Sequence, residues 1–285
     1  MSNVTAPRST RPPGSATVPR QLSLSDVTSK GPGLPSRIIL HGVEKIGKSS
    51  FGANCPSPFF AMTKGESGLL TLIDSGIIPE TPHLPELQTW DDLLWVINTL
   101  TTQDHGYKTF VLDTLNGAER LCHEHVCARE YGGQWGKTGF TNYNAGYDVS
   151  LADWRQLLVA LDKLRETKRM MVMLLCHTKI KNFKNPTGPD FDRYTPDMHE
   201  KTWGITHKWA DIILFANFEV FTTKEGARTK GIGGKTRMIY TVRDAAYDAG
   251  NRHNLAESID MGEDGKAAWN NFSKAMIEAK GGNKS

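Results

Sequence analysis

The stretch GVEKIGKS at residues 42–49 decides the fold of this sequence of 285 residues. It matches the pattern G-x-x-x-x-G-K-[ST], a glycine-rich loop whose backbone N–H groups bind phosphate. The β-branched run at 37–41 before it predicts a buried strand, and residues 49–53 after it can begin a helix. A loop in this setting directs its N–H groups toward a triphosphate. The residues expected to bind the nucleotide are Gly42, Val43, Glu44, Lys45, Ile46, Gly47, Lys48, Ser49 and Ser50.

Two residues of this loop have side chains suited to the phosphates and their metal ion. Lys48 is expected to reach the β- and γ-phosphates of ATP, and Ser49 is expected to bind Mg²⁺. The apolar strand expected at 107–114 carries Asp113 near its end, where a carboxylate completes the Mg²⁺ shell. An aspartate after a strand is common, but it becomes informative here because it follows a phosphate-binding loop.

Two further strands are expected to end in residues that can act near the γ-phosphate. The strand at 58–62 leads into a polar turn with Glu66, a candidate base for orienting the attacking water. An ordinary loop glutamate is an equally good interpretation. The strand at 170–176 ends at His177, which is either a sensor of the γ-phosphate or a structural histidine with satisfied hydrogen bonds.

Composition limits the class of protein. Hydrophobic residues make up 38% of the chain, which supports a sizeable core, and the formal net charge is +3. No apolar run approaches the roughly 20 residues of a membrane-spanning helix, so no membrane partner is expected. The first residues lack the apolar segment of a secretory signal, and the four cysteines form no disulfide-rich pattern. We therefore expect an intracellular, reduced protein.

The chain is expected to consist of one domain between two tails. Residues 1–34 are rich in Ser, Thr, Pro and Arg and predict a disordered tail, followed by an ATPase domain at 35–280 and a flexible tail at 281–285. Strands at 210–221 and 236–242 are expected to pair as an antiparallel hairpin. Apolar periodicity predicts helices at 91–100, 115–131, 151–167 and 269–279.

Two segments lack apolar periodicity and are expected to be loops. Residues 132–147 are rich in glycine and carry aromatic residues expected to be exposed, and residues 179–208 interleave basic and aromatic residues with four acids. Because basic groups bind phosphates and aromatic rings stack on bases, the second loop suits single-stranded nucleic acid. A mobile lid or a contact between subunits is the alternative. The residues expected to contact DNA are Lys137, Lys179, Lys181, Phe183, Lys184, Arg193, Tyr194 and Lys201.

The order of these features narrows the class of P-loop protein. Residues 182–185 do not supply the N-K-x-D motif of a GTPase, and the sequence lacks the arginine-rich lid of a small-molecule kinase. The order is a phosphate-binding loop, a strand with an acid, a strand ending in aspartate, a glycine loop, a helix, a strand ending in histidine, a long loop and a hairpin. That order is typical of a RecA-type ATPase core.

Longer stretches carry a more specific resemblance. They are HGVEKIGKSS at 41–50, YKTFVLDT at 107–114, HVC at 125–127, CHTKIKNF at 176–183, DFDRY at 190–194, WADIILFAN at 209–217 and GNRHNL at 250–255. Over residues 35–272 the chain resembles the phage-encoded, core-only RecA-like ATPases that act in single-strand annealing and recombination. The resemblance implies an α/β fold: a RecA-like P-loop NTPase core with a mostly parallel central sheet, flanking helices and a C-terminal antiparallel hairpin.

The resemblance also implies roles for single residues. Glu66 resembles the catalytic glutamate, and His177 resembles the γ-phosphate sensor that couples nucleotide state to DNA binding. Arg252 resembles a basic residue that reaches the nucleotide of a neighbouring subunit. Residues 132–147 and 178–207 resemble the two DNA-binding loops of a RecA core.

The chain departs from the family pattern at two places. Where the family often has T-E-D-G, this chain has TKGESG at 63–68, so a neighbour of Glu66 remains an alternative for the catalytic acid. Where the family often has Lys-Asn-Arg, this chain has GNR at 250–252, which removes one cation that could act in trans. Both departures predict slow ATP turnover.

Together these features predict an ATPase that uses ATP and Mg²⁺, binds single-stranded DNA, assembles with itself as a ring or filament and promotes annealing or strand pairing. By the resemblance, it would act in the cytoplasm of an infected bacterial host and contact a single-strand-binding protein. The alternative is a RecA-like regulatory ATPase that gates a protein partner without binding DNA, with residues 178–207 as a docking surface. A helicase motor is less favoured, because the sequence predicts no accessory domain to grip a duplex.

Overall fold

The computed structural model describes residues 23–225 and 228–281 of the chain. The sequence predicts tails at 1–34 and 281–285, and the outer parts of both, up to residue 22 and from residue 282, lie outside the described residues. By its contacts the chain divides into two compact units, with the boundary in the sequence after Gly33. In the part that the structure describes, none of the helices has the length and apolarity needed to cross a bilayer.

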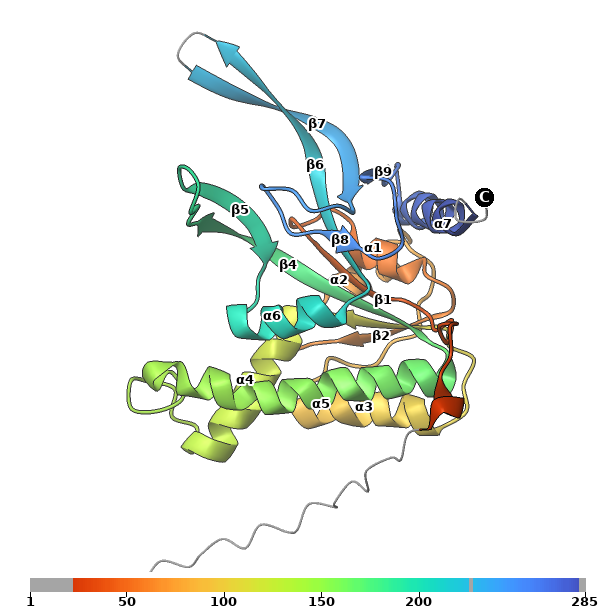
Figure 1. Cartoon of the computed structure of the whole chain (residues 1–285), viewed down its shortest axis with the longest axis vertical. Coiled ribbons are helices and arrows are strands. Elements are labelled where there is room, and N and C mark those ends of the chain that lie inside the picture. Colours follow the sequence, from red (N-terminus) through yellow and green to blue (C-terminus); the bar gives the residue numbers. More distant parts are fainter. Residues whose placement is uncertain (1–22, 226–227, 282–285) are drawn as a thin grey trace, which may run out of the picture. The chain divides into compact units, whose positions relative to one another are not determined.

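A nine-stranded sheet, counted over the described residues, forms the centre of the larger unit (Figure 1). Its strands are β1 (Arg37–Gly42), β2 (Pro58–Met62), β3 (Thr109–Asp113), β4 (Met171–Phe183), β5 (Phe191–Pro196), β6 (Ile212–Glu225), β7 (Arg228–Tyr240), β8 (Gly250–Asn251) and β9 (Ser258–Asp260). The order is β2-β3-β4-β1-β6-β7-β9, with β5 beside β4 and β8 beside β6. The first five strands of this order run parallel, and β7 returns antiparallel to β6. The predicted fold class is therefore confirmed.

Helices cover both faces of this sheet (Figure 1). They are α1 (Lys48–Ala53), α2 (Gly68–Asp74), α3 (Trp90–Thr102), α4 (Leu115–Tyr131), α5 (Ala145–Lys168), α6 (Glu200–Trp209) and α7 (Gly265–Gly281), with 3₁₀ turns η1 (Leu24–Asp26) and η2 (Asn142–Asn144). Successive side chains of a strand point to opposite faces, so Ile39 packs in the core with α3, α4 and α5, whereas Ile38 and Leu40 pack in the core with α1, α2 and α7.

Local signals fix the ends of the predicted helices. Thr89 caps α3 together with Asp92, and each side chain accepts the backbone N–H of the other residue. Thr114 caps α4 by accepting the N–H of Gly117. The same helix ends at Gly132, whose φ of 56° is left-handed and terminates the hydrogen-bond ladder.

The structure corrects the loop predicted at residues 179–208. β4 continues as far as Phe183, β5 pairs antiparallel beside it, and α6 follows. The first half of β4 is buried, and its end is exposed on both faces. Lysines alternate with Ile180 and Phe183 in this exposed end without a regular apolar period, so the sequence gives no signal for these strands.

The predicted flexible loop at 132–147 is organised by one aromatic residue. Phe140 is fully buried, with ring centroids of Trp135 and Tyr147 at 4.8 and 5.1 Å. A Cβ at Gly146 would lie 2.4 Å from the Phe140 ring, so glycine permits this close approach. The expected exposure of aromatic residues holds for Tyr143, at 96%, and is wrong for Phe140.

Replacing Trp154 of α5 tests the packing of α3, α5 and α6. Trp154 is 1% exposed, stacks on Trp90 at 6.0 Å and donates its Nε1–H to the Thr206 hydroxyl at 2.8 Å. We expect Trp154→Ala to lower the free energy of unfolding by about 3–5 kcal/mol, measured by urea denaturation with far-ultraviolet circular dichroism. The control Trp95→Ala on α3, where the side chain is 62% exposed, should change it by about 0.5 kcal/mol or less. Equal losses would contradict this account of the packing.

Candidate nucleotide-binding site

The loop at 42–49 leaves β1 at the carboxyl edge of the parallel sheet and leads into α1. Gly47 has a φ of 106°, a left-handed conformation that glycine adopts without steric cost. A Cβ at Gly42 would lie 2.4 Å from the carbonyl oxygen of Ala216 on the neighbouring β6. The two glycines of the motif are therefore required by backbone conformation and by close strand packing.

The polar side chains of this loop face an acid from another strand. The Ser49 hydroxyl donates to Asp113 Oδ2 at 2.8 Å, and Asp113 ends β3. The Lys48 ammonium donates to the carbonyl oxygens of Gly42 and Val43, each at 3.0 Å. A hydroxyl beside a carboxylate is the oxygen donor set that Mg²⁺ prefers, so these residues fit a magnesium nucleotide.

Burial makes ionised side chains in this site costly in free energy. It raises the pKa of Asp113 to about 6, against the hydrogen bond from Ser49, which lowers it. It also lowers the pKa of Lys48, against the attraction of Asp113. Each charged form lacks the solvation of bulk water, so the site favours a cation beside Asp113 and an anion beside Lys48.

Glu66 and His177 meet beside this carboxylate. His177 Nε2 lies 3.1 Å from Glu66 Oε1, and the Thr114 hydroxyl donates to the same oxygen at 3.2 Å. The bond to Glu66 raises the pKa of His177. Burial raises the pKa of Glu66, but the hydrogen bonds from His177 and Thr114 hold it below its ordinary value. The pair therefore favours an imidazolium with a carboxylate.

Strand register brings these residues together. In the parallel pairs, Met62 lies opposite Asp113, Asp113 opposite Leu175, and Gly42 opposite His177. Since β2, β3, β4 and β1 are neighbours, the turn after β2, the end of β3, the middle of β4 at His177 and the loop after β1 converge on one edge. A polar cavity of about 320 Å³, lined in part by Glu66, opens next to this edge.

Comparison with known proteins gives a family. A family model described as an AAA domain matches residues 34–253, which include the loop, Asp113 and His177. The chain belongs to this AAA-domain family. Among solved structures, the crystal structure of the RadB recombinase is similar at 11% identity, over 82% of this chain and 90% of that chain, with a TM-score of 0.45. None of the curated proteins matches the chain.

Three residues of the site in this AAA domain have weaker signals or none in the sequence. Thr114 directly follows Asp113 and Asn116 lies three positions after it, and Asn116 Oδ1 accepts the backbone N–H of His177 at 3.1 Å. Their position just after an aspartate-bearing strand is a usable signal. Arg237 of β7 donates to the carbonyl oxygen of Ile46 at 3.4 Å, and it reaches the loop only through sheet order, which no local pattern encodes.

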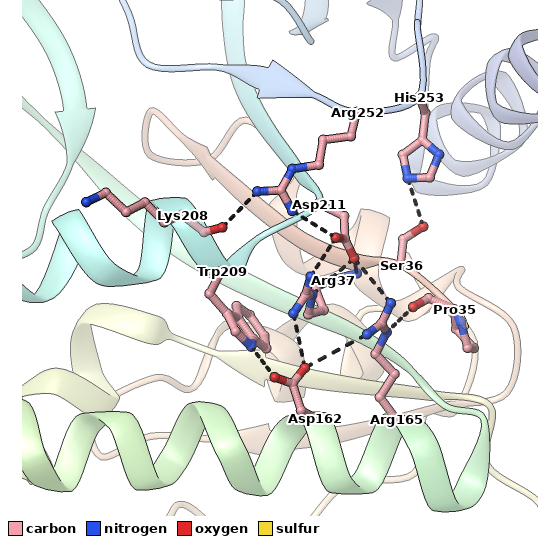
Figure 2. A network of polar contacts seen from close by, with 10 residues as sticks. All are labelled: Pro35, Ser36, Arg37, Asp162, Arg165, Lys208, Trp209, Asp211, Arg252 and His253. Atoms are coloured by element: carbon pink, nitrogen blue, oxygen red, sulfur yellow. Dashed lines mark hydrogen bonds and ion pairs between the residues drawn. The ribbon is translucent and has the colours of Figure 1, made fainter. Parts of the chain in front are cut away.

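Arg252 lies elsewhere in the AAA domain. Figure 2 shows it in a polar network, where it donates to Asp211 at 3.3 Å and to the carbonyl oxygen of Lys208 at 2.8 Å. Asp211 also binds Arg37, the first residue of β1, at 2.7 Å. The network therefore lies at the amino end of β1, whereas the phosphate-binding loop follows its carboxyl end. The structure does not bring Arg252 to the nucleotide site of its own chain, and its reach to a neighbouring subunit stays a prediction.

Most of the cations expected to contact DNA are paired with acids. The pairs are Lys179–Asp197 at 3.1 Å, Lys181–Glu200 at 3.2 Å, Lys184–Asp190 at 2.7 Å, Lys201–Asp148 at 2.6 Å and Arg193–Asp248. Lys137 is exposed and makes no ion pair with any residue that the structure describes. Exposed ion pairs contribute about 0–1 kcal/mol each, so the lysines can exchange their partners at low cost.

The structure corrects the surface position expected for Arg193. Its residue is 8% exposed, and its guanidinium binds Asp248 and the carbonyl oxygen of Tyr247 at 3.0 Å. Tyr194 packs beside it on Phe215, with ring centroids 5.2 Å apart. Arg193 therefore connects β5 to the segment before β8, and a DNA phosphate has little access to it. Phe183, at the end of β4, remains 37% exposed.

Replacing Asp113 by asparagine tests the electrostatic account of the site. The folded pKa of about 6 lies above the ordinary 3.8, so the ionised carboxylate destabilises the fold above pH 6. This penalty fades as the pH falls from 6 toward 3.8. Without nucleotide or Mg²⁺, we expect Asp113→Asn to raise the free energy of unfolding at pH 8 by on the order of 1–3 kcal/mol and at pH 5 by about half as much, by urea denaturation.

Glu66→Gln is the matched control, because the pKa of Glu66 is shifted in the opposite direction to that of Asp113. A lowered pKa makes Glu66 stabilising above 4.5, and this stability is lost as the pH falls through its folded pKa. Because the pKa of His177 is raised, its contribution to the free energy of unfolding is complete below pH 6.5 and is lost as the pH rises through the folded pKa. We expect Glu66→Gln to destabilise most between these limits. The same sign of effect for both variants would contradict the assignment.

Proposed function

We propose that the protein is a RecA-like ATPase that binds single-stranded DNA and promotes annealing or strand pairing in the DNA metabolism of a bacteriophage. One ATPase domain at 35–280 hydrolyses ATP with Mg²⁺ and assembles with further copies as a ring or filament. It acts in the cytoplasm of an infected host, with a single-strand-binding protein as partner. The AAA domain supports nucleotide use, and the sequence resemblance supports the DNA assignments.

The observation that carries this proposal is the continuity of β4. Its buried half ends at His177, which binds Glu66 at the nucleotide site. The same strand continues through Lys179 and Lys181 to Phe183 in the exposed hairpin. A displacement of His177 is therefore transmitted directly along one strand to the basic and aromatic side chains that suit single-stranded DNA.

The residues of the site have separate tasks in this proposal. The loop N–H groups and Lys48 hold the phosphates, and Ser49 with Asp113 holds Mg²⁺, which neutralises charge on the phosphate oxygens when bound. Glu66, held ionised by its hydrogen bonds, orients the attacking water and accepts its proton. Arg252 supplies positive charge to the nucleotide of a neighbouring subunit.

One observation favours the second candidate function, the gating of a protein partner. The hairpin cations are balanced by acids, and a cavity of about 330 Å³ beneath them is lined by Met198, His199 and Trp203. Such a mixed surface also suits a protein. The two functions differ in how binding responds to salt. Contacts with DNA phosphates make the logarithm of the association constant fall linearly with the logarithm of the salt concentration, whereas a protein interface responds less steeply.

Hydrolysis assays on the Lys48→Ala variant test the nucleotide site. We expect the variant to lose ATP hydrolysis by on the order of 10²-fold, because it lacks the cation on the phosphates. The rate in the native chain should rise with single-stranded DNA at about 50 mM salt and rise less at about 200 mM. Full activity of Lys48→Ala would contradict the assignment of the nucleotide site. A hydrolysis rate that single-stranded DNA does not change at either salt concentration would favour the gating function.

A double substitution tests the DNA surface. Lys181 and Lys184 are 57% and 85% exposed, so Lys181→Ala with Lys184→Ala removes cations without removing core packing. We expect weaker binding of labelled oligothymidine and a salt slope smaller by about 0.7 for each lost phosphate contact. The control pair Lys266→Ala with Lys274→Ala on α7 should leave affinity and slope unchanged. An unchanged slope in the hairpin variant would overturn the DNA surface.

A further inference from the structure

Helices α3 and α5 lie side by side (Figure 1). A groove between them is lined by residues of both helices. Its volume is about 420 Å³, and its exposed surface is mainly apolar, although Asn98, Thr101 and Gln156 line it beside Ile97 and Ala160. Arg155 and Lys163 also line it, and no acid does. No residue of the nucleotide site or of the β4–β5 hairpin contributes to it, so the proposed function leaves this surface without a role.

The α5 side of the groove has a regular pattern of cation, apolar residue and cation. Arg155, Val159 and Lys163 are four residues apart and share one face of the helix. Val159 is 67% exposed, which is high for a β-branched residue in a helix. Within the described part of the chain, Arg155 and Lys163 make no ion pair, in contrast to the lysines of the hairpin.

The α3 side adds an exposed aromatic ring. Trp95 is 62% exposed and borders a second hollow, of about 190 Å³, which Leu84 and Tyr107 also line. Tryptophan is enriched among residues that dominate binding at interfaces. The exposed face of α3 is thus flanked by two hollows with apolar walls.

We infer that the α3–α5 groove binds a short acidic peptide segment of a partner protein, with an apolar side chain seated at Val159 and acids at Arg155 and Lys163. The two cations are separated by eight helical residues, or about 12 Å along the axis. An extended peptide advances about 3.3 Å per residue, so two acids four positions apart match both cations. A nucleic acid would leave the apolar floor unmatched, and a basic or neutral peptide would leave both cations unpaired.

Fluorescence anisotropy with a defined peptide tests this inference on the full-length chain. The probe is a fluorescein-labelled octapeptide with two aspartates four positions apart and a phenylalanine midway between them. We expect saturable binding that weakens at least tenfold in Arg155→Glu with Lys163→Glu, and also in Val159→Asp. Because the cations bind acids, a second probe with lysines in place of the aspartates should bind the charge-reversed variant better than the native chain.

The chain offers a matched control on another helix. Lys266 and Lys274 of α7 are exposed and also eight residues apart, with Asn270 in place of an apolar residue between them. Lys266→Glu with Lys274→Glu changes the net charge equally and should leave peptide affinity unchanged. Circular dichroism melting of each variant checks the fold.

Several results would overturn the inference. They are undetectable binding, equal affinity for a peptide with serines in place of the aspartates, and equal weakening in the α7 control. Displacement of the peptide by single-stranded DNA, with loss of DNA affinity in the groove variant, would assign the surface to nucleic acid. Self-association of the native chain that Val159→Asp abolishes, without peptide binding, would assign it to a second copy. Since ATP hydrolysis is not the readout, failure here leaves the proposed function untouched.

Discussion

The parallel register of β2, β3, β4 and β1 is the constraint on which the site depends. Asp113 ends β3, Glu66 lies shortly after β2, the loop at 42–49 leaves the end of β1, and His177 lies within β4 opposite Gly42. A shift of one residue in any pair would turn the buried side chains of that strand toward the opposite helical layer. The apolar cores on both faces therefore fix the register, and the register in turn sets the Ser49–Asp113 and Glu66–His177 contacts. Packing far from the phosphates thus controls geometry beside them.

The two carboxylates of the site are held in different states by their surroundings. Asp113 is buried with one hydroxyl donor, and its pKa is raised to about 6. Glu66 has a histidine and a hydroxyl as donors, and its pKa is lowered. A carboxylate that is costly to ionise gains most from a bound cation, whereas one already stabilised as an anion is ready to act as a base. Environment alone therefore suits Asp113 to the metal ion and Glu66 to the water, and cation binding at Asp113 would stabilise the folded protein by mass action.

The sequence predicts the parts of the structure that local signals encode. The loop at 42–49 has its own motif, and α4 has a cap, an apolar face and a terminal glycine, so its bounds at 115–131 match. The segment at 179–208 has none of these, because its order comes from partners distant in sequence. Glu119 of α4, for example, accepts the backbone N–H of His199 at 3.0 Å and so holds the start of α6. An arginine in a polar segment such as Arg193 is expected at the surface, and only its ion pair with Asp248 in the folded structure shows that it is buried. Pairwise contacts of this kind are set by the fold, and no local pattern of residues contains them.

Charge distribution determines what form the proposed DNA binding must take. Residues 1–33 contain four basic residues and one acidic residue, which account for the whole net charge of +3, so residues 34–285 are formally neutral. A DNA phosphate that binds a hairpin lysine displaces the acid paired with that lysine. The displaced carboxylate stays within the screening length of about 8–10 Å of the DNA and repels the next phosphate. Electrostatic attraction between DNA and this surface is therefore weak, and the affinity for DNA must come from contacts that do not depend on net charge. Lys179, Lys181 and Phe183 alternate along β4 and share one face of the strand. Stacking on such a ring contributes about 1–3 kcal/mol per base, which makes Phe183 as important to the proposed binding as the lysines beside it.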